Sequence, residues 1–153
     1  MNAVVEVRLH RIPIRTHARA QEHNEELTRE FQLIVDRARS AEPSVPHRLV
    51  ELSTTLTARY AGMTEEQEET VDRAIREGLP MLEELVFQVP RHAGEAAELL
   101  GRMLDEADEY CRQGEHLLTL ATPPDLVAYR RWYLNEFVAQ AAGLPPTPWP
   151  GGL

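Results

Sequence analysis

Apolar side chains recur at helical spacing through most of this 153-residue chain, and this pattern limits the fold more than any other feature. Five stretches carry such a stripe on one side, over about residues 16–39, 45–62, 64–77, 91–112 and 122–142. A glycine or proline at or just after the end of each stretch is typical of a helix end. Because the connections are short, we expect the five helices to pack as a bundle around one core.

Two further stretches predict β-strands. Residues 4–14 alternate, with Val5, Val7 and Leu9 on one face and Glu6, Arg8 and His10 on the other. A second β-prone run covers residues 84–89 and is followed by Pro90. These runs could pair as a ribbon, which persists only with helices packed against it. The sequence therefore predicts a mainly α fold, a single-domain bundle of about five helices over residues 1–143 with a minor two-stranded β ribbon, followed by a Pro-rich tail over residues 144–153.

The charge and the basic residues exclude several classes of function. The net charge of −9 argues against binding to nucleic acid or to an anionic membrane surface, because both need a basic face. All sixteen basic residues are arginine, so neither a P-loop lysine nor a Schiff-base lysine is present. Cys111 is the single cysteine, there is no signal-peptide pattern, and no apolar run approaches the length of a membrane span. We therefore expect a cytoplasmic protein.

The last predicted helix places an arginine on its apolar face. At 100° per residue, Arg130 falls near the middle of the face that is expected to be core. That face comprises Leu126, Val127, Arg130, Tyr133, Leu134, Phe137, Val138 and Ala141. A buried guanidinium needs a carboxylate, carbonyl groups or a ligand. It would form either a structural ion pair, with Asp108 of the preceding helix as the nearest candidate, or an anion-binding site in a cleft.

A histidine stands on the apolar stripe of the first helix. His23 precedes Leu27 by one turn and has Glu26 three residues after it, so it is either a core or cap histidine or a ligand-binding one. Metal binding through His17, His23 and Glu26 is a further alternative, although neither HExxH nor Glu-x-x-His occurs. Cys111 has no CxxC partner and is expected to be a small core residue. We assign no catalytic residue, no metal and no cofactor.

The tail has polyproline character from Leu144 to Pro150. Such a segment either binds a partner or folds back and buries its tryptophan, Trp149. Trp132 is predicted to point away from the core face of the last helix, so it would pack under the tail or contribute to an interface. Because tryptophan is enriched in interface hot spots, Trp132 and Trp149 are candidates for a partner interface.

Three segments of the chain carry a resemblance, HARAQEHNEELTREF at residues 17–31, DEADEYC at residues 105–111 and YRRWYLNEF at residues 129–137. Together they resemble a set of small actinobacterial proteins associated with the anti-sigma kinases, STAS domains and phosphatases of partner-switching systems. The kinase and phosphatase signatures themselves are absent, since there is no ATP-binding glycine box and no metal-binding aspartate set. The resemblance implies an accessory role in regulation.

Two hypotheses of function follow. In the first, the protein is a non-enzymatic cytoplasmic helical regulator that binds another protein or itself through Trp132 and Trp149. In the second, it is a small-molecule or anion-binding sensor, or a hydrolase, with a pocket between the first, fourth and fifth helices. The residues of that pocket would be Arg130, His23 and Asp108.

Overall fold

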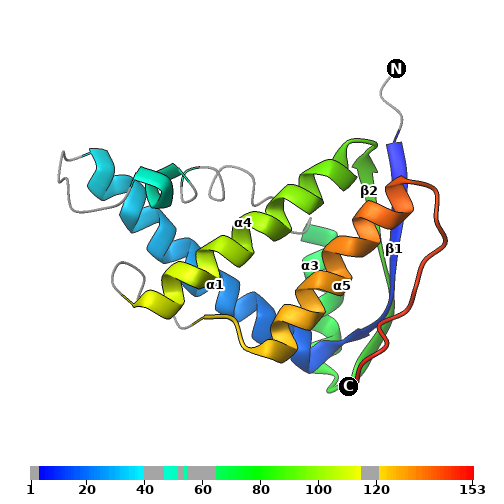
Figure 1. Cartoon of the computed structure of the whole chain (residues 1–153). Coiled ribbons are helices and arrows are strands. Elements are labelled where there is room, and N and C mark those ends of the chain that lie inside the picture. The colour runs from blue at the N-terminus through cyan, green and yellow to red at the C-terminus, as the bar shows by residue number, and fades with distance from the viewer. Residues whose placement is uncertain (1–3, 40–46, 52–53, 55–64, 115–120) are drawn as a thin grey trace. The chain divides into compact units, whose positions relative to one another are not determined.

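The computed structural model describes residues 4–39, 47–51, 54, 65–114 and 121–153, and the elements within these ranges are mainly helical (Figure 1). In chain order they are β1 (Val4–Pro13), α1 (Ile14–Arg39), α3 (Glu65–Arg76), β2 (Met81–Pro90), α4 (Ala93–Gln113) and α5 (Pro124–Ala141). Residues 47–51 are also helical. The prediction of a mainly α fold with a minor two-stranded β ribbon is confirmed. Of the helix expected over residues 45–62, only residues 47–51 and 54 are described.

The chain divides into two compact units. The first, called here the ribbon unit, comprises Met1–Ala20, Met63–Gly101 and Pro124–Leu153. The second, called here the helical unit, comprises Gln21–Gly62 and Arg102–Pro123. Two of the boundaries between the units fall within α1 and α4, and another directly precedes α5.

The core of the ribbon unit is built on the antiparallel pair β1 and β2. Val5 pairs with Val89, Val7 with Phe87 and Leu9 with Leu85, so the inward face of β1 continues across the ribbon. Val7 and Leu9 are fully buried, as their alternation with exposed Glu6 and Arg8 predicts. The buried cluster is completed by Ile12, Val71 of α3 and Tyr129 of α5. A two-stranded ribbon of this kind is stabilised by the helices packed against it.

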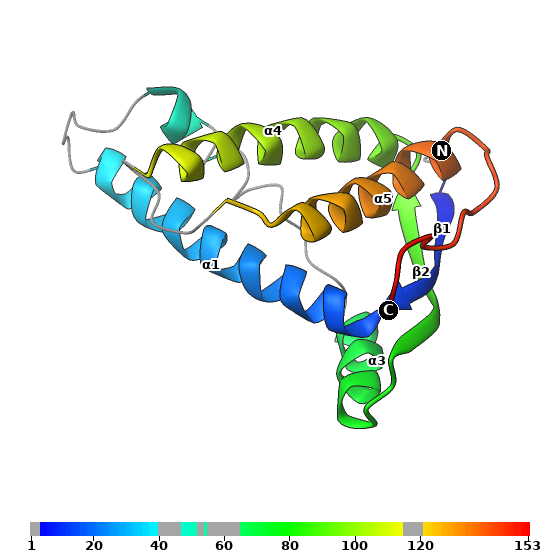
Figure 2. The ribbon, with the colours of Figure 1, turned by 60° about the horizontal axis from the view of Figure 1, so that its bottom comes forward.

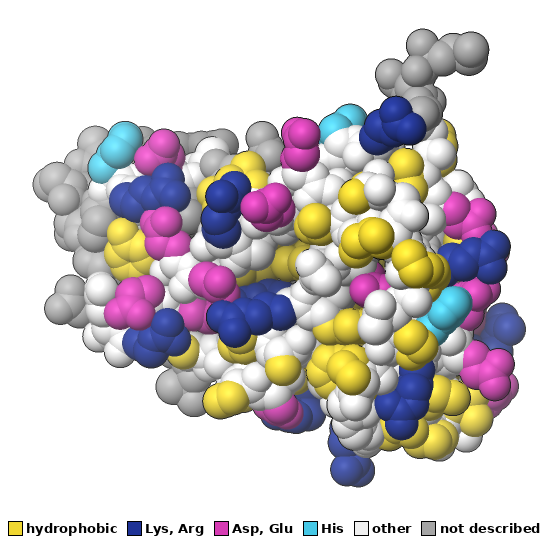
Figure 3. All heavy atoms as spheres, turned by 45° about the vertical axis from the view of Figure 1, so that its right-hand side comes forward, with side chains coloured by type: hydrophobic (Ala, Val, Ile, Leu, Met, Phe, Trp, Pro, Cys, Tyr) yellow, Lys and Arg dark blue, Asp and Glu magenta, His cyan; other side chains and the backbone are white. Residues whose placement is uncertain are grey.

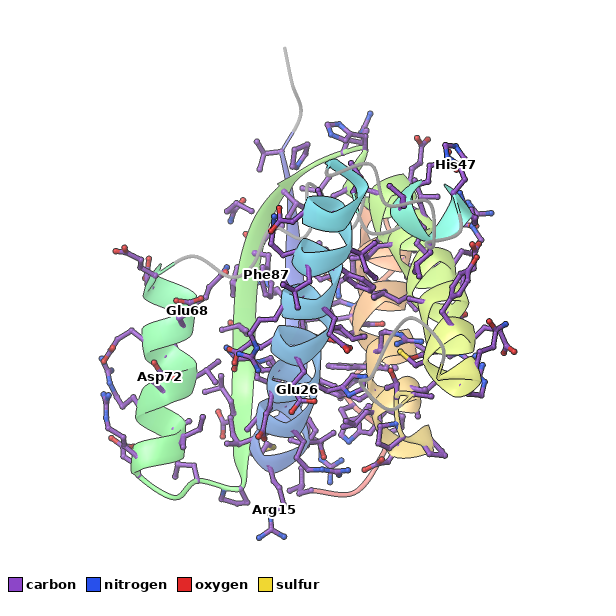
Figure 4. All side chains as sticks on the ribbon, turned by 90° about the vertical axis from the view of Figure 1, so that its left-hand side faces the viewer. Arg15, Glu26, His47, Glu68, Asp72 and Phe87 are labelled. Atoms are coloured by element: carbon purple, nitrogen blue, oxygen red, sulfur yellow. The ribbon has the colours of Figure 1, made fainter. Side chains whose placement is uncertain are left out.

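At each open edge of the ribbon, the side chain of a glutamine forms hydrogen bonds with the strand backbone. The two backbone positions, Arg8 of β1 and Val86 of β2, are partners in the strand pairing. On β1, the side-chain oxygen of Gln140 accepts from the Arg8 N–H at 2.8 Å, and its NH₂ group donates to the Arg8 carbonyl at 2.8 Å. On β2, Gln67 of α3 donates to the Val86 carbonyl at 2.8 Å, and Figure 4 shows α3 beside β2. An unpaired strand edge invites pairing with another chain, so these side chains occupy groups that a third strand would use.

Replacing Gln140 with leucine is expected to lower the free energy of unfolding by about 2–3 kcal/mol. The change keeps a side chain of similar size but removes both bonds to Arg8 and the bond to Glu136, and a half-buried donor or acceptor left unsatisfied costs about 1 kcal/mol or more. Urea unfolding followed by circular dichroism measures the difference. Gln88→Leu is the matched control, because Gln88 is exposed and should change stability by less than about 0.5 kcal/mol. Equal losses in the two variants would contradict the edge-capping role.

The helical unit has its own buried side chains. They come from α1 (Leu27, Phe31, Ile34), from the segment at residues 47–51 (Leu49) and from α4 (Met103, Leu104, Ala107, Cys111). Arg48 and Glu106 form a bidentate ion pair at the surface, with Nε–Oε2 and Nη2–Oε1 distances of 2.6 and 3.0 Å. This pair links the segment at residues 47–51 to α4 within the unit.

The predicted core face of α5 was wrong at several positions. On α5, the most buried side chains are Leu126, Tyr129, Glu136 and Gln140. The predicted core residues of α5 other than Leu126 are only half-buried. The physical reason is that the side of α5 facing the edge of β1 must offer hydrogen-bonding groups as well as apolar ones.

Trp132 packs against the tail, as one of its two predicted alternatives has it, but it does not point away from the core. Its indole belongs to the partly buried side chains that pack against the core cluster of the ribbon unit, together with Tyr133, Phe137 and Trp149. Apolar residues surround α5 on every side, so its periodicity does not distinguish the face that meets the ribbon.

Candidate functional site

An aromatic cluster joins α5, β2 and the tail. It contains Phe87, Tyr129, Trp132, Tyr133, Phe137 and Trp149. Tyr129 lies at its centre, with ring centroids 5.8 Å from Trp132 and 5.5 Å from Trp149. Trp132 and Trp149 meet edge to face at 5.6 Å. Edge-to-face and tilted ring pairs at these separations are favourable beyond the area that they bury.

The tail is bound along this cluster and along the open edge of β1 (Figure 2). Helix α5 ends in a left-handed turn at Gly143 (φ 91°), where Leu144 N–H bonds back to the Ala139 carbonyl. The indole N–H of Trp132 then donates to the Thr147 carbonyl at 2.9 Å, and the Thr147 N–H donates to Glu136 at 2.7 Å. These bonds fix the direction in which the tail returns.

Further along, the tail reaches β1 itself. The backbone N–H of Trp149 donates to the His10 carbonyl at 3.0 Å. The guanidinium of Arg11 donates from Nη1 to the carbonyls of Trp149 and Gly151, at 2.9 and 2.8 Å. The edge of β1 that Gln140 closes at Arg8 is therefore closed by the tail at His10.

Arg11 has an unusual backbone at this point. Its φ is +62°, in the left-handed region, and it is the one non-glycine residue with positive φ among the described residues. An arginine in that region costs on the order of 1 kcal/mol or more, and such strain clusters at binding sites. Arg11 is also skipped in the pairing register between His10 and Ile12. The residue with the left-handed backbone is therefore also the one whose side chain donates hydrogen bonds to two carbonyls of the tail.

We call the surface formed by Tyr129, Trp132, Glu136, His10 and Arg11 the tail-docking surface. Figure 3 brings forward the side of the ribbon unit that carries α5 and the tail, and hydrophobic side chains gather there with charged groups around them. Glu136 is 2% exposed, and its carboxylate accepts from Gln140 as well as from Thr147, which compensates its burial. The surface thus combines aromatic rings with a fixed set of donors and acceptors.

His17 supports Tyr129 from α1. Its Nδ1 lies 2.8 Å from the Tyr129 hydroxyl, and the rings meet at 90° with centroids 5.9 Å apart. Burial lowers the pKa of His17 to about 4 and raises the pKa of Tyr129 well above its usual value. Both groups are therefore neutral near pH 7. The sequence pattern placed His17 among metal-ligand candidates, whereas the structure gives it a hydrogen bond inside the aromatic cluster.

The candidate residues His23 and Asp108 meet through a third residue that the sequence did not single out. In the helical unit, Thr122 Oγ1 lies 3.0 Å from Nε2 of His23 and donates to Asp108 Oδ1 at 2.6 Å. The Thr122 N–H donates to the same oxygen at 3.0 Å. Asp108 is 3% exposed, and these bonds hold the segment that leads into α5. His23 and Asp108 thus both bond to Thr122 and fix the position of this segment within the helical unit.

The third residue of the predicted pocket, Arg130, belongs to the ribbon unit. It is half-buried on α5 and takes part in interactions within the fold. Because His23 and Asp108 belong to the helical unit, a pocket shared by the three stays a prediction, and so does the ion pair between Arg130 and Asp108.

Cys111 is buried on α4. Desolvation and the nearby Asp108 carboxylate raise the pKa of its thiol to about 12, so it is not a thiolate at neutral pH. Its predicted role as a small core residue agrees with this position. Among the described residues, no group of three histidine, cysteine or acidic side chains is placed to hold a metal ion.

Comparison with known proteins adds no assignment. No family model matches the sequence, and neither the curated proteins nor the solved structures contain a significant match to the chain. None of the helices in the described ranges has the length and apolar character needed to cross a membrane.

Proposed function

We propose that this protein is a non-enzymatic regulator that acts by binding another protein or a second copy of itself, and that its binding surface is the tail-docking surface. The observation that carries the proposal is the docked tail. An extended segment that packs an aromatic ring on α5 and bonds to the edge of β1 uses interactions that peptide-binding domains use.

The chemistry of the surface supports an extended peptide rather than a helix or a flat protein face. Peptide backbone groups are received at regular places, because Trp132 and Arg11 donate to carbonyls and Glu136 and His10 accept from N–H groups. Tryptophan and tyrosine rings add the apolar contact, and both types are common at the energetic centre of interfaces. A partner segment would replace the tail and use the same groups.

The hydrogen bonds that hold the tail are only partly shielded from water. The bond between Trp132 and Thr147 is exposed to water, and the Arg11 bonds are half-buried. Hydrogen bonds in such places contribute about 0.5–1.5 kcal/mol each. The resemblance of residues 17–31, 105–111 and 129–137 implies an accessory role beside partner-switching regulators. A surface that binds either the tail or a partner is compatible with that role.

In the Trp149→Ala protein, whose tail has lost the ring that competes with a partner, replacing Trp132 with alanine is expected to weaken partner binding at least tenfold. Trp132 supplies both a ring contact to Trp149 and the donor to Thr147, and truncation of a hot-spot tryptophan commonly costs 2 kcal/mol or more. The full-length protein, immobilised and exposed to lysate of its native host, would capture the partner. Titration of the purified partner then gives the dissociation constant, and light scattering tests self-association.

Ile75→Ala is the matched control. Ile75 is a large apolar residue of the same unit, is 43% exposed on α3, and is not part of the tail-docking surface. Its replacement should leave the dissociation constant unchanged. If, in the Trp149→Ala background, the Trp132→Ala and Ile75→Ala changes both left partner binding or self-association unchanged, the proposed function would be wrong.

A further inference from the structure

We infer that the tail-docking surface recognises a particular peptide pattern in a partner: an extended segment with a tryptophan, one further residue and then a glycine, in which the positions flanking the tryptophan can be proline. The inference rests on the proposed function and names the chemistry of the partner. The tail of this chain, TPWPGG at residues 147–152, is the resident example of the pattern.

The tryptophan position is defined by two rings. Trp149 lies edge to face with Tyr129 and with Trp132, at centroid separations of 5.5 and 5.6 Å. Tyr129 is 3% exposed and belongs to the core cluster, so the ring of Trp149 packs against a side chain that is fixed by the core. The indole N–H of Trp149 donates to the Gly152 carbonyl at 3.1 Å, which curls the end of the segment around the ring.

The glycine position is set by sterics. A Cβ atom on Gly151 would lie 2.6 Å from Cε2 and 2.9 Å from Nε1 of Trp149, closer than side-chain carbons approach ring atoms. The ring cannot swing away without leaving Tyr129 and Trp132. Any larger residue two places after the tryptophan must therefore unseat either the ring or the carbonyl that Arg11 binds at 2.8 Å.

The flanking positions explain why prolines are tolerated. The surface receives the N–H groups of Thr147 and Trp149, which alternate along an extended chain. Pro148 and Pro150 stand at the positions in between, where no N–H is used, so a residue without a donor fits there. Proline also restricts the segment to extended conformations before binding, which reduces the entropy lost on docking.

The binding test uses the full-length Trp149→Ala protein, in which the resident ring is removed and the rest of the chain is kept. A labelled peptide of residues 144–153 is titrated into this variant and into the unaltered protein, and fluorescence anisotropy is followed. A short tether gives the resident tail an effective concentration of about 1 mM. The variant should therefore bind the peptide at concentrations at least tenfold lower than the unaltered protein does.

A peptide with alanine in place of Gly151 is the control for the pattern, and Arg11→Ala in the Trp149→Ala background is the control for the surface. Both should weaken binding at least tenfold. Equal binding of the glycine and alanine peptides would overturn the inference, as would the absence of binding to the Trp149→Ala protein. If circular dichroism shows that the Trp149→Ala protein is unfolded, the full-length Gly151→Ala protein replaces it. That variant keeps the Trp149 ring but weakens its docking, because the added Cβ collides with the ring.

The two proposals fail in different ways. If partner binding depends on Trp132 but the peptide of residues 144–153 does not compete with the partner, the proposed function stands and the tryptophan–glycine pattern is wrong. If the peptide binds and its alanine form does not, while partner binding is indifferent to Trp132, the pattern describes only the docking of the resident tail. The proposed function is then wrong, and so is the assignment of the pattern to a partner.

Discussion

Replacing Tyr129 with alanine is expected to lower the free energy of unfolding by about 3–5 kcal/mol, which is typical for the loss of a large aromatic side chain from a core. Tyr129 is 3% exposed and is the point at which β1, α5 and the tail converge, through the core cluster and through its contacts with Trp132 and Trp149. No nearby side chain can fill the volume of a ring without moving. Urea unfolding monitored by circular dichroism measures the loss.

Tyr129→Phe separates the ring from the hydroxyl. It keeps the packing but leaves the buried Nδ1 of His17 without its partner at 2.8 Å, so we expect a smaller cost of about 1–3 kcal/mol. If the phenylalanine variant lost as much stability as the alanine variant, the hydroxyl rather than ring packing would dominate. Losses below about 1 kcal/mol in both variants would contradict the seating of α5 on the ribbon.

Stability should decrease as the pH falls from about 6.5 to about 4, because of His17. Its pKa is 6.5 in the unfolded chain and about 4 in the folded one, so within this window the unfolded state binds a proton that the folded state does not. The stability of the fold is complete above pH 6.5 and is lost progressively below it. A shift of this size corresponds to about 3 kcal/mol at the acid end.

The measurement compares urea unfolding of the unaltered protein and of His17→Gln at pH 7.5 and pH 4.5. Glutamine retains hydrogen-bonding capacity toward Tyr129 but does not titrate. Carboxylates such as Glu84 and Asp125, whose pKa values are lowered by His10 and Arg19, contribute to both proteins alike and cancel in the difference. The pH dependence should be weaker in the variant by about 2–3 kcal/mol. Identical pH dependence in the two proteins would show that His17 does not titrate as described.

Much of the fold could be predicted because short-range patterns decide it. The alternation of Val5, Val7 and Leu9 allowed β1 and its buried face to be predicted, and both partners of the ribbon were recognised. The predicted second strand was too short, since Met81-Leu-Glu does not alternate and its extension depends on pairing with Ile12 and Pro13. The candidate site was predicted in part. Trp132 and Trp149 were singled out, and they are in contact.

The residues that the sequence did not reveal are those whose roles depend on distant backbone. Glu136 and Gln140 are polar residues four positions apart in an apolar helix, which is the only signal that they carried. Nothing in the sequence marked Arg11 for a left-handed backbone or for contacts with carbonyls about 140 residues away. The pocket proposed for His23, Asp108 and Arg130 stays a prediction, and the sequence did not reveal that Thr122 joins the histidine and the aspartate.

The sequence by itself determined the secondary structure and the mainly helical class, because periodicity and helix-ending residues act over a few positions. It also marked the aromatic last helix and the Pro-rich tail. Only the tertiary structure decided which side of α5 is buried and what the tail does. Apolar residues surround α5, so hydrophobicity does not choose its face; the choice is made by the edge of β1, whose backbone groups must be satisfied by Gln140 and the tail.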